Sequence, residues 1–217
     1  MFYQDSRQIY RVTELDSLDW LIHGFGTRHA DIPALFSQLA TVKQVHSATC
    51  VAAEGRSGVL GEADALIENR PGTVVAVKTA DCIPVLLADT RNRAVAAVHA
   101  GWRGTAAHIV ERAVEAMAAR FGTAPADVRA AIGPGIGKCC YEVGPEVSAQ
   151  FGHEGRVHLD LAAENRAQLE KLGIPPGQVY VSQLCTMCGP EFHSFRRDKE
   201  AAGRMYSFIG VTLGERT

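Results

Sequence analysis

Three apolar segments in close succession constrain the fold of this chain more than any other feature of its sequence. They are residues 74–79 (VVAVKT), 83–88 (IPVLLA) and 94–99 (AVAAVH). Their apolar residues stand at consecutive positions, which is typical of strands buried on both faces. Because a sheet built from such strands must be covered on both sides, the sequence predicts a layered fold.

A change of hydrophobic period predicts a helix over residues 105–120. Apolar residues recur there at helical spacing, with Thr105 as the expected N-cap and Gly122 as the expected stop. Residues 145–151 and 160–172 are further helix candidates, the second capped by Asp160. Residues 128–132, 179–184 and 207–211 are further strand candidates, and 133–137 (GPGIG) is rich in turn formers.

Helices and strands are thus mixed without strict βαβ alternation. We expect an α/β or α+β layered sandwich with a mixed sheet. No repeat, low-complexity linker or charge block divides the 217 residues, so we expect a single domain over residues 1–217.

Composition excludes several classes of function. With 22 Lys+Arg against 24 Asp+Glu, no bulk positive field draws the chain to nucleic acid or anionic lipid. No apolar run approaches the roughly 18 residues of a membrane span, and the first residues lack the pattern of a secretion signal. Six cysteines are too few for a disulfide scaffold in a chain of this length, which favours the reducing cytoplasm.

Polar side chains able to bind metal stand near the ends of the apolar segments. His46 ends one segment, Cys82 lies in a turn between two buried runs, and His99 precedes the turn into the first long helix. Two imidazoles and one thiolate suit zinc and leave a fourth position open for water or substrate. The alternative, a small core cysteine and two hydrogen-bonded histidines, stays open on spacing alone.

Further polar residues near these segments are candidates for catalysis and substrate binding. Asp64 and Asp81 are placed to carry protons or to cap turns. The turn from Gly101 to Thr105 would offer backbone N–H groups to an anion at a helix start, with Arg103 adding a bidentate contact.

Successive side chains of an extended segment point to opposite faces, which indicates which of the remaining candidates lie together. In KQVHS it puts Gln44 beside His46, on the face opposite Lys43. In FHSFRRD an extended strand would set Arg196 beside Ser194 and turn Arg197 away, which favours Arg196 as a site residue. Cys185 and Cys188 form half of a zinc-ribbon pattern without a second C-x-x-C. By default we expect them to be structural thiols, together with Cys50, Cys139 and Cys140.

Six motifs taken together resemble one family over roughly residues 20–212. They are KQVHS (43–47), ADALI (63–67), TADCIPVLLAD (79–89), AAVHAGWRGTA (96–106), AIGPGIGKCCYEVG (131–144) and CTMC...FHSFRRD...GRMYSFIGV (185–211). They are similar to those of the YfiH family, the laccase-domain or polyphenol oxidase proteins. The resemblance implies that His46, Cys82 and His99 hold zinc.

The resemblance also implies a fold and an activity. The fold is an α/β sandwich shared with the catalytic domain of cytotoxic necrotizing factor and with CheD-type receptor glutamine deamidases. The activity is that of a purine nucleoside phosphorylase acting on adenosine, inosine, guanosine and methylthioadenosine, with adenosine deaminase activity. Its partners would be a purine nucleoside and phosphate. A second family role is peptidoglycan editing, the removal of misincorporated serine from muramoyl precursors.

For such an activity, Cys82, His99, Asp81 and Asp64 are the expected catalytic residues. Arg28 matches an arginine of the family's N-terminal motif, although the segment between it and His46 is shorter here than in relatives. The expected substrate-binding residues are Lys43, Gln44, Arg28, Arg103, Ser194, Arg196 and Arg197.

Other chemistries receive less support from the residues. No two of the eight histidines are two positions apart, so the paired His-x-His motifs of multicopper oxidases are absent and copper would be adventitious. The H-x-E and P-C-x-x-C signatures of cytidine-type deaminases are absent too. A metal-free alternative remains, in which Cys82 and His99 act as thiolate and general base of a cysteine hydrolase or deamidase.

Overall fold

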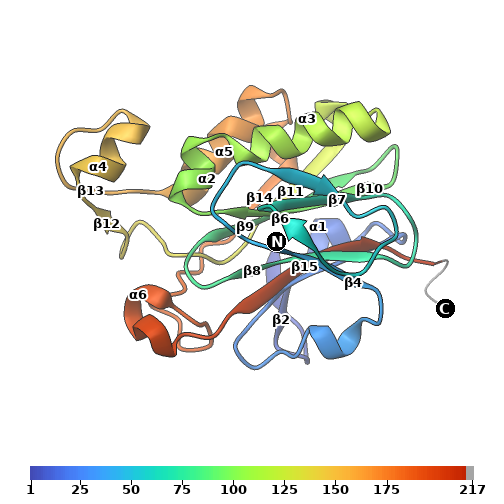
Figure 1. Cartoon of the computed structure of the whole chain (residues 1–217), viewed down its shortest axis with the longest axis horizontal. Helices are drawn as coiled ribbons and strands as arrows, with labels where there is room; N and C mark the ends of the chain where they lie inside the picture. The colour runs from blue at the N-terminus through green and yellow to red at the C-terminus, as the bar shows by residue number, and fades with distance from the viewer. Residues whose placement is uncertain (214–217) are drawn as a thin grey trace.

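The computed structural model describes residues 1–213 and consists of two stacked β-sheets with the two longest helices on one side (Figure 1). The strands of the first sheet, in spatial order, are β1 (Phe2–Gln4), β2 (Ile9–Val12), β3 (Leu21–Gly26), β15 (Met205–Val211), β8 (Val74–Thr79), β4 (Leu39–Lys43) and β6 (Gly58–Glu62). Those of the second are β14 (Val179–Val181), β11 (Val128–Ile132), β9 (Ile83–Asp89), β10 (Ala94–Ala100), β7 (Ala65–Glu68) and β5 (Cys50–Ala52). A separate small pair is formed by β12 (Glu142–Val143) and β13 (Val157–His158).

The helices are short apart from two. They are α1 (Thr13–Asp16), α2 (Trp102–Ala106), α3 (Ile109–Phe121), α4 (Pro145–Ser148), α5 (Leu161–Lys171) and α6 (Phe195–Asp198). Single 3-10 turns stand at Pro33–Leu35, Pro125–Asp127, Ala149–Phe151, Pro176–Gln178 and Lys199–Ala201. No helix among residues 1–213 combines the length and the apolar character that crossing a membrane requires.

The central strands are apolar on both faces because each face packs into a different core. Along β9, Val85 and Leu87 join the core shared with the helices, whereas Leu86 and Ala88 join the core between the two sheets. Since successive side chains of a strand point to opposite faces, both positions must be apolar. The prediction of strands over 74–79, 83–88 and 94–99 is confirmed.

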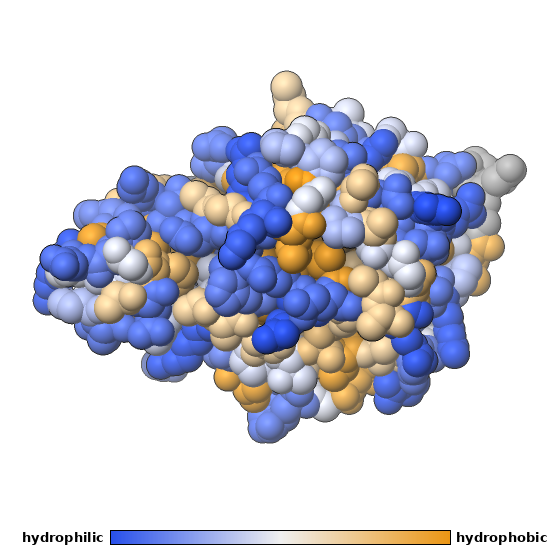
Figure 2. All heavy atoms as spheres, turned by 90° about the horizontal axis from the view of Figure 1, so that it is seen from above, coloured by the Kyte–Doolittle hydropathy of each residue, from blue (hydrophilic) through white to orange (hydrophobic). Residues whose placement is uncertain are grey.

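Helices α3 and α5 cover the outer face of the six-stranded sheet (Figure 1). Val110, Val114 and Met117 of α3 are buried against this sheet, in the same core as Leu169 of α5. Figure 2 views the helical face from outside and shows hydrophilic residues over most of it, as expected of amphipathic helices. Gly122 adopts the left-handed conformation and ends α3, as predicted.

The predicted helix over 105–120 is wrong at its start. The chain forms α2 first, with Gly101 as its N-cap, and then breaks at His108, whose φ is 60°. Thr105 therefore lies inside α2 and caps no helix; its hydroxyl accepts a hydrogen bond from the Asn165 amide at 3.0 Å. A helix of five residues also lacks the long dipole that the predicted anion site relied on.

Both sheets are mixed, which confirms the predicted fold class. β4 runs parallel to β8 and β6, and β5 parallel to β7, whereas β10 pairs antiparallel with both β7 and β9. Strand β15 inserts between β3 and β8, so segments from both ends of the chain share one sheet. Two predicted strands have shifted bounds, because β14 ends at Val181 and β15 begins at Met205.

Candidate active site

The residues of the candidate site lie together at the ends of neighbouring strands. In the antiparallel pair of β10 and β9, His99 lies opposite Pro84, and Cys82 directly precedes β9. Asp64 directly precedes β7, and the backbone N–H of His99 donates to its carbonyl at 2.8 Å. The segment after β4 brings His46 to the same edge. The ligand atoms of His46, Cys82 and His99 all lie within 4.8 Å of one another.

The carboxylate of Asp64 organises this edge. It is fully buried and accepts hydrogen bonds from the backbone N–H groups of Val45, His46 and Ser47 at 2.6 to 3.3 Å. It also accepts the Ser47 hydroxyl at 2.8 Å and contacts Nδ1 of His99 at 2.8 Å. This cradle holds His46 at φ 59°, a left-handed conformation that a histidine adopts at a cost.

Ionisation of Asp64 follows from the same contacts. Burial alone raises the pKa of Asp64, but the hydrogen bonds from His99 and Ser47 outweigh it and lower the pKa to about 2. The carboxylate is therefore charged at neutral pH. It fixes the ring of His99 through Nδ1, which leaves Nε2 to act as a ligand, as is common for metal-binding histidines.

The donor set fits a metal ion. Two imidazoles and one thiolate lie close enough to share one ion, and three protein ligands are the number that catalytic zinc sites use, with a fourth position for water or substrate. The backbone at Gly101 passes close to these donors, since a Cβ there would lie 3.0 Å from Sγ of Cys82 and 3.2 Å from Cδ2 of His46. A side chain at this position would therefore crowd Cys82 and His46, which would have to shift by a few tenths of an ångström.

Cys82 and His99 are electrostatically coupled. Burial raises the pKa of Cys82, but hydrogen bonds to His46 and His99 prevail and bring it to about 6. Burial lowers the pKa of His99, but its bonds to Asp64 and Cys82 raise it to about 9. Without a metal, the pair is thus a thiolate and an imidazolium at neutral pH, and the thiolate is the form that binds metals and attacks electrophiles.

A cavity of about 530 Å³ opens onto the three donors. This volume lies within the range of sites for small molecules. Its lining combines aromatic, cationic and metal-binding side chains, namely Lys43, Gln44, His46, Lys78, Ala80, Asp81, Cys82, His99, Ile136, Tyr141, Phe195, Arg196 and Arg204.

Asp81 links three segments around this cavity. Its φ of 85° is unusual for a residue other than glycine. One carboxylate oxygen accepts the Thr186 hydroxyl at 2.7 Å, and the other accepts the backbone N–H of Arg196 at 2.6 Å. Of the two predicted proton carriers, Asp81 lines the cavity, whereas Asp64 lies behind His99 and is buried.

The extended strand predicted at FHSFRRD is wrong, since the segment forms the short helix α6. Ser194 is buried and caps this helix, its hydroxyl accepting the backbone N–H of Arg197 at 3.2 Å. The Arg197 guanidinium donates to the carbonyls of Thr186, Met187, Gly189 and Phe192 and so fastens the neighbouring loop. The helix nevertheless directs Arg196 to the cavity, where its guanidinium lies over Tyr141 at 5.3 Å.

Gln44 and Lys43 both line the cavity, although their polar groups also contact the protein. The Gln44 amide exchanges two hydrogen bonds of 2.7 Å with the backbone of Lys78. Lys43 forms an exposed ion pair with Glu62 at 2.7 Å.

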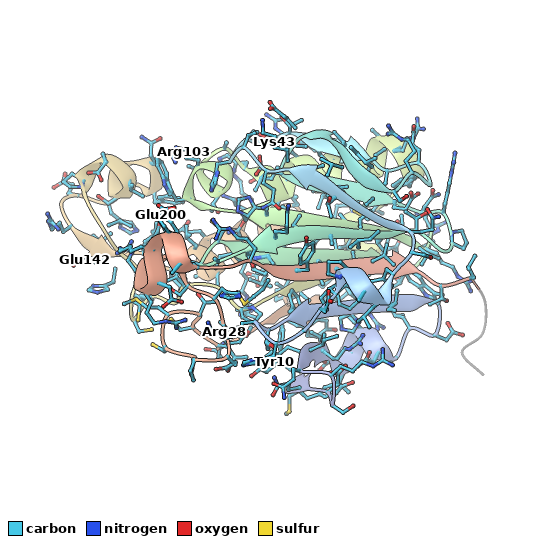
Figure 3. The ribbon with its side chains drawn as sticks, turned by 60° about the horizontal axis from the view of Figure 1, so that its bottom comes forward. Tyr10, Arg28, Lys43, Arg103, Glu142 and Glu200 are labelled. Atoms are coloured by element: carbon cyan, nitrogen blue, oxygen red, sulfur yellow. The ribbon has the colours of Figure 1, made fainter. Side chains whose placement is uncertain are left out.

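Arg103 and Arg28 lie on different sides of α6, as Figure 3 shows. Arg103, on α2, is exposed and stacks over the neighbouring Trp102 ring at 4.4 Å. Arg28 lies against the loop before α6, where it donates to the Pro190 carbonyl at 3.3 Å. The fold therefore brings Arg103 to the same side as Lys43, and Arg28 to the opposite side.

Several cavity residues were missed by reasoning from the sequence alone. Tyr141, Phe195 and Arg204 line the cavity, and Phe195 keeps 43% of its surface exposed. All three stand inside the motifs that carried the family resemblance, which was the signal available for them. Lys78 lies outside these motifs, and the four apolar residues that precede it in its strand gave no reason to expect it at the cavity.

Comparison with known proteins places these residues in a family. A family model described as "Multi-copper polyphenol oxidoreductase laccase" matches residues 27–212. The chain belongs to this family. It is 43% identical over 186 residues to a protein of Deinococcus radiodurans named purine nucleoside phosphorylase, an alignment that covers 81% of this chain and 71% of the relative.

Two further relatives extend the comparison. A protein of an unknown prokaryotic organism named adenosine deaminase RL5 is 38% identical over 161 residues, covering 67% of this chain and 61% of the relative. The crystal structure of the hypothetical protein YfiH from Bacillus licheniformis superposes with a TM-score of 0.88 at 30% identity, over 97% of this chain and 99% of that one. The resemblance to the YfiH family is therefore confirmed.

Proposed function

We propose that this protein is a zinc-dependent purine nucleoside phosphorylase that accepts adenosine, inosine, guanosine and methylthioadenosine and also deaminates adenosine. The observation that carries the proposal is the meeting of His46, Cys82 and His99 at a cavity of nucleoside size. The names of the Deinococcus radiodurans relative and of adenosine deaminase RL5 support both reactions.

Zinc would be held by Nε2 of His99, a ring nitrogen of His46 and the Cys82 thiolate. When bound, it supplies a Lewis acid that polarises substrate or water near neutral pH. The ionised Asp64 keeps the His99 ring in the orientation that this requires. Copper has the same donors to bind and would be adventitious there.

The remaining cavity residues fall into two groups, one suited to bind the purine and the other suited to bind phosphate. The rings of Tyr141 and Phe195 offer faces on which a purine stacks. The cationic groups of Lys78, Arg196 and Arg204 offer charge-assisted hydrogen bonds to phosphate.

In phosphorolysis a phosphate oxygen forms a bond to C1′ of the ribose while the bond from C1′ to the purine nitrogen breaks. The electron pair stays on the purine, which takes up a proton, and pentose 1-phosphate is the second product. Asp81 is the carboxyl at the cavity and is assigned the role of proton carrier. In deamination water attacks C6 of adenosine and ammonia leaves.

One observation favours a second candidate, a metal-free cysteine hydrolase or deamidase. Cys82, with its pKa of about 6, is a thiolate at neutral pH and lies beside His99. Metal content separates the two candidates. Stoichiometric zinc at His46, Cys82 and His99 after purification without chelator would exclude the free thiolate as the working form.

The activity test compares inosine and adenosine with and without phosphate. The proposal expects base and pentose 1-phosphate from inosine only when phosphate is present, and inosine from adenosine in its absence. If the protein turns over neither nucleoside but releases serine from UDP-muramoyl serine, this result would contradict the proposal and favour peptidoglycan editing.

We also propose that residues 1–217 form one domain and act in the cytoplasm. The shared seven-stranded sheet, in which β15 lies between β3 and β8, supports the first point. Six free cysteines support the second, because thiols persist in reducing compartments.

A further inference from the structure

Four cysteines that the candidate active site does not use meet at a second place. Cys139 and Cys140 come from the turn after β11, and Cys185 and Cys188 from the loop after β14. Their four sulfur atoms lie within 4.8 Å of one another, although the two pairs are more than 40 positions apart in sequence.

The spacing of the sulfurs matches a tetrahedral metal centre. Sulfur–sulfur distances are 3.4 Å between Cys140 and Cys188, 3.6 Å between Cys139 and Cys140, and 3.8 Å between Cys139 and Cys188. A zinc ion with four thiolates at about 2.3 Å places its sulfurs about 3.8 Å apart. All four cysteines are free thiols, so no disulfide competes for these atoms here.

The backbone around the cluster supplies a hydrogen-bond donor to one of the sulfur atoms. Gly137 lies beside Cys185, and a Cβ at Gly137 would lie 3.2 Å from Cβ of Cys185 and 3.3 Å from Sγ of Cys139. The Gly137 N–H donates to Sγ of Cys185 at 3.2 Å. Donation of N–H groups to a ligating sulfur is the outer-shell support that metal sites require.

We propose that Cys139, Cys140, Cys185 and Cys188 bind one structural Zn²⁺ ion, separate from the centre at Cys82. Four thiolates complete the tetrahedron and leave no position for substrate, which is typical of structural and not of catalytic zinc. On binding, each thiol gives its proton to solvent and its sulfur forms a bond to zinc, with no change of oxidation state.

This zinc ion would tie together two loops that shape the cavity. Tyr141 follows Cys140 directly and lines the cavity. Thr186 lies between Cys185 and Cys188, is fully buried and donates its hydroxyl to Asp81. The two loops also meet through the β-bridge between Gly135 and Cys185 and through the hydrogen bond from Gly137 to Cys185. The metal therefore positions Asp81 and Tyr141 without touching substrate.

Metal content of purified variants tests the proposal. The wild-type chain should carry two zinc ions, Cys188→Ser one and Cys82→Ala one, whereas Cys50→Ser should keep two. Cys50 lies on β5 in neither cluster and is the matched control for loss of a thiol. A wild-type chain with one zinc ion that Cys188→Ser retains would overturn the proposal.

A second measurement needs no variant and so does not depend on folding. Cys139 and Cys188 are exposed, so alkylation should reach them readily if they were free. In zinc-loaded protein, iodoacetamide followed by peptide mass mapping should find both protected, and a chelator should expose both. Equal alkylation with and without chelator, iron in place of zinc, or a Cys140–Cys188 disulfide would each overturn the proposal.

Discussion

At the scale of single residues, Asp64 decides the geometry of the candidate centre. Five hydrogen-bonding groups converge on its buried carboxylate, three of them backbone N–H groups of the segment that carries His46. An amide in its place can accept with only one oxygen and would set its N–H groups against these donors. Asp64 therefore positions both histidines without itself being a ligand.

Replacing Asp64 by asparagine should destabilise the protein by roughly 2–4 kcal/mol. The change should also alter its pH dependence. The pKa of Asp64 falls from 3.8 in the unfolded chain to about 2 in the folded one, so its contribution is present above pH 4 and is lost as the pH falls toward 2. This contribution is roughly 2 kcal/mol.

Urea unfolding of wild type and Asp64→Asn between pH 5 and pH 2 measures that difference. The stability gap should narrow as the pH falls. The exposed Asp19→Asn is the control and should follow the wild type. A gap that stays constant over this range would show that the charge of Asp64 does not stabilise the fold.

Substitution of Gly101 tests how closely the backbone approaches the three metal-binding side chains. Its φ of −72° suits alanine, so Gly101→Ala should leave the backbone unstrained and act only through the contacts of its Cβ with Cys82 and His46. We expect zinc affinity to fall by about 10- to 100-fold. Gly177→Ala, where a Cβ meets nothing within 4 Å, is the matched control. Equal zinc affinity in the two variants would refute the close approach.

At the scale of elements, α6 connects the cavity to the loop that holds two of the four clustered cysteines. Its cap at Ser194 and the bond from the Arg196 N–H to Asp81 fix the direction of Phe195 and Arg196. The prediction from the sequence was wrong here, because a segment of seven residues is too short for its hydrophobic spacing to separate a strand from a short capped helix.

Ser194→Ala should cost about 1 kcal/mol of stability and raise KM for nucleoside and phosphate more than it lowers kcat. The reason is that a frayed α6 no longer holds Phe195 and Arg196 at the cavity. Asp160→Ala removes the cap of α5, which contributes no residue to the lining of the cavity, and should cost similar stability with KM unchanged. KM is measured by steady-state kinetics. Equal KM values for the two variants would show that α6 has no role in substrate binding.

The break between α2 and α3 shows a second limit of sequence reasoning. Apolar spacing predicts α3 well from Ile109 onward, and Gly122 predicts its end. The break itself needs His108 in a left-handed conformation, and no glycine or proline announces it. His108 is exposed, and its imidazole contacts the carboxylate of Glu111 in the first turn of α3 at 2.8 Å.

At the scale of the whole molecule, strands buried on both faces were the part of the fold that the sequence revealed. The central strands β8, β9 and β10 lie between two cores, so their apolar pattern is continuous and easy to find. The outer strands β1, β2 and β6 are short or partly exposed, and their weaker patterns gave no prediction. The candidate ligands were found because they stand at strand ends, whereas the four-cysteine cluster joins distant loops and is visible only in three dimensions.

The central claim is that the donors His46, Cys82 and His99 form the working metal centre of a nucleoside phosphorylase. The most direct measurement compares phosphate-dependent cleavage of inosine by Cys82→Ala and Cys50→Ala, with zinc content determined on the same samples. We predict that Cys82→Ala loses one zinc ion and more than about 100-fold in kcat/KM, while Cys50→Ala keeps both. Cleavage by Cys82→Ala at a rate within about twofold of Cys50→Ala would contradict the account.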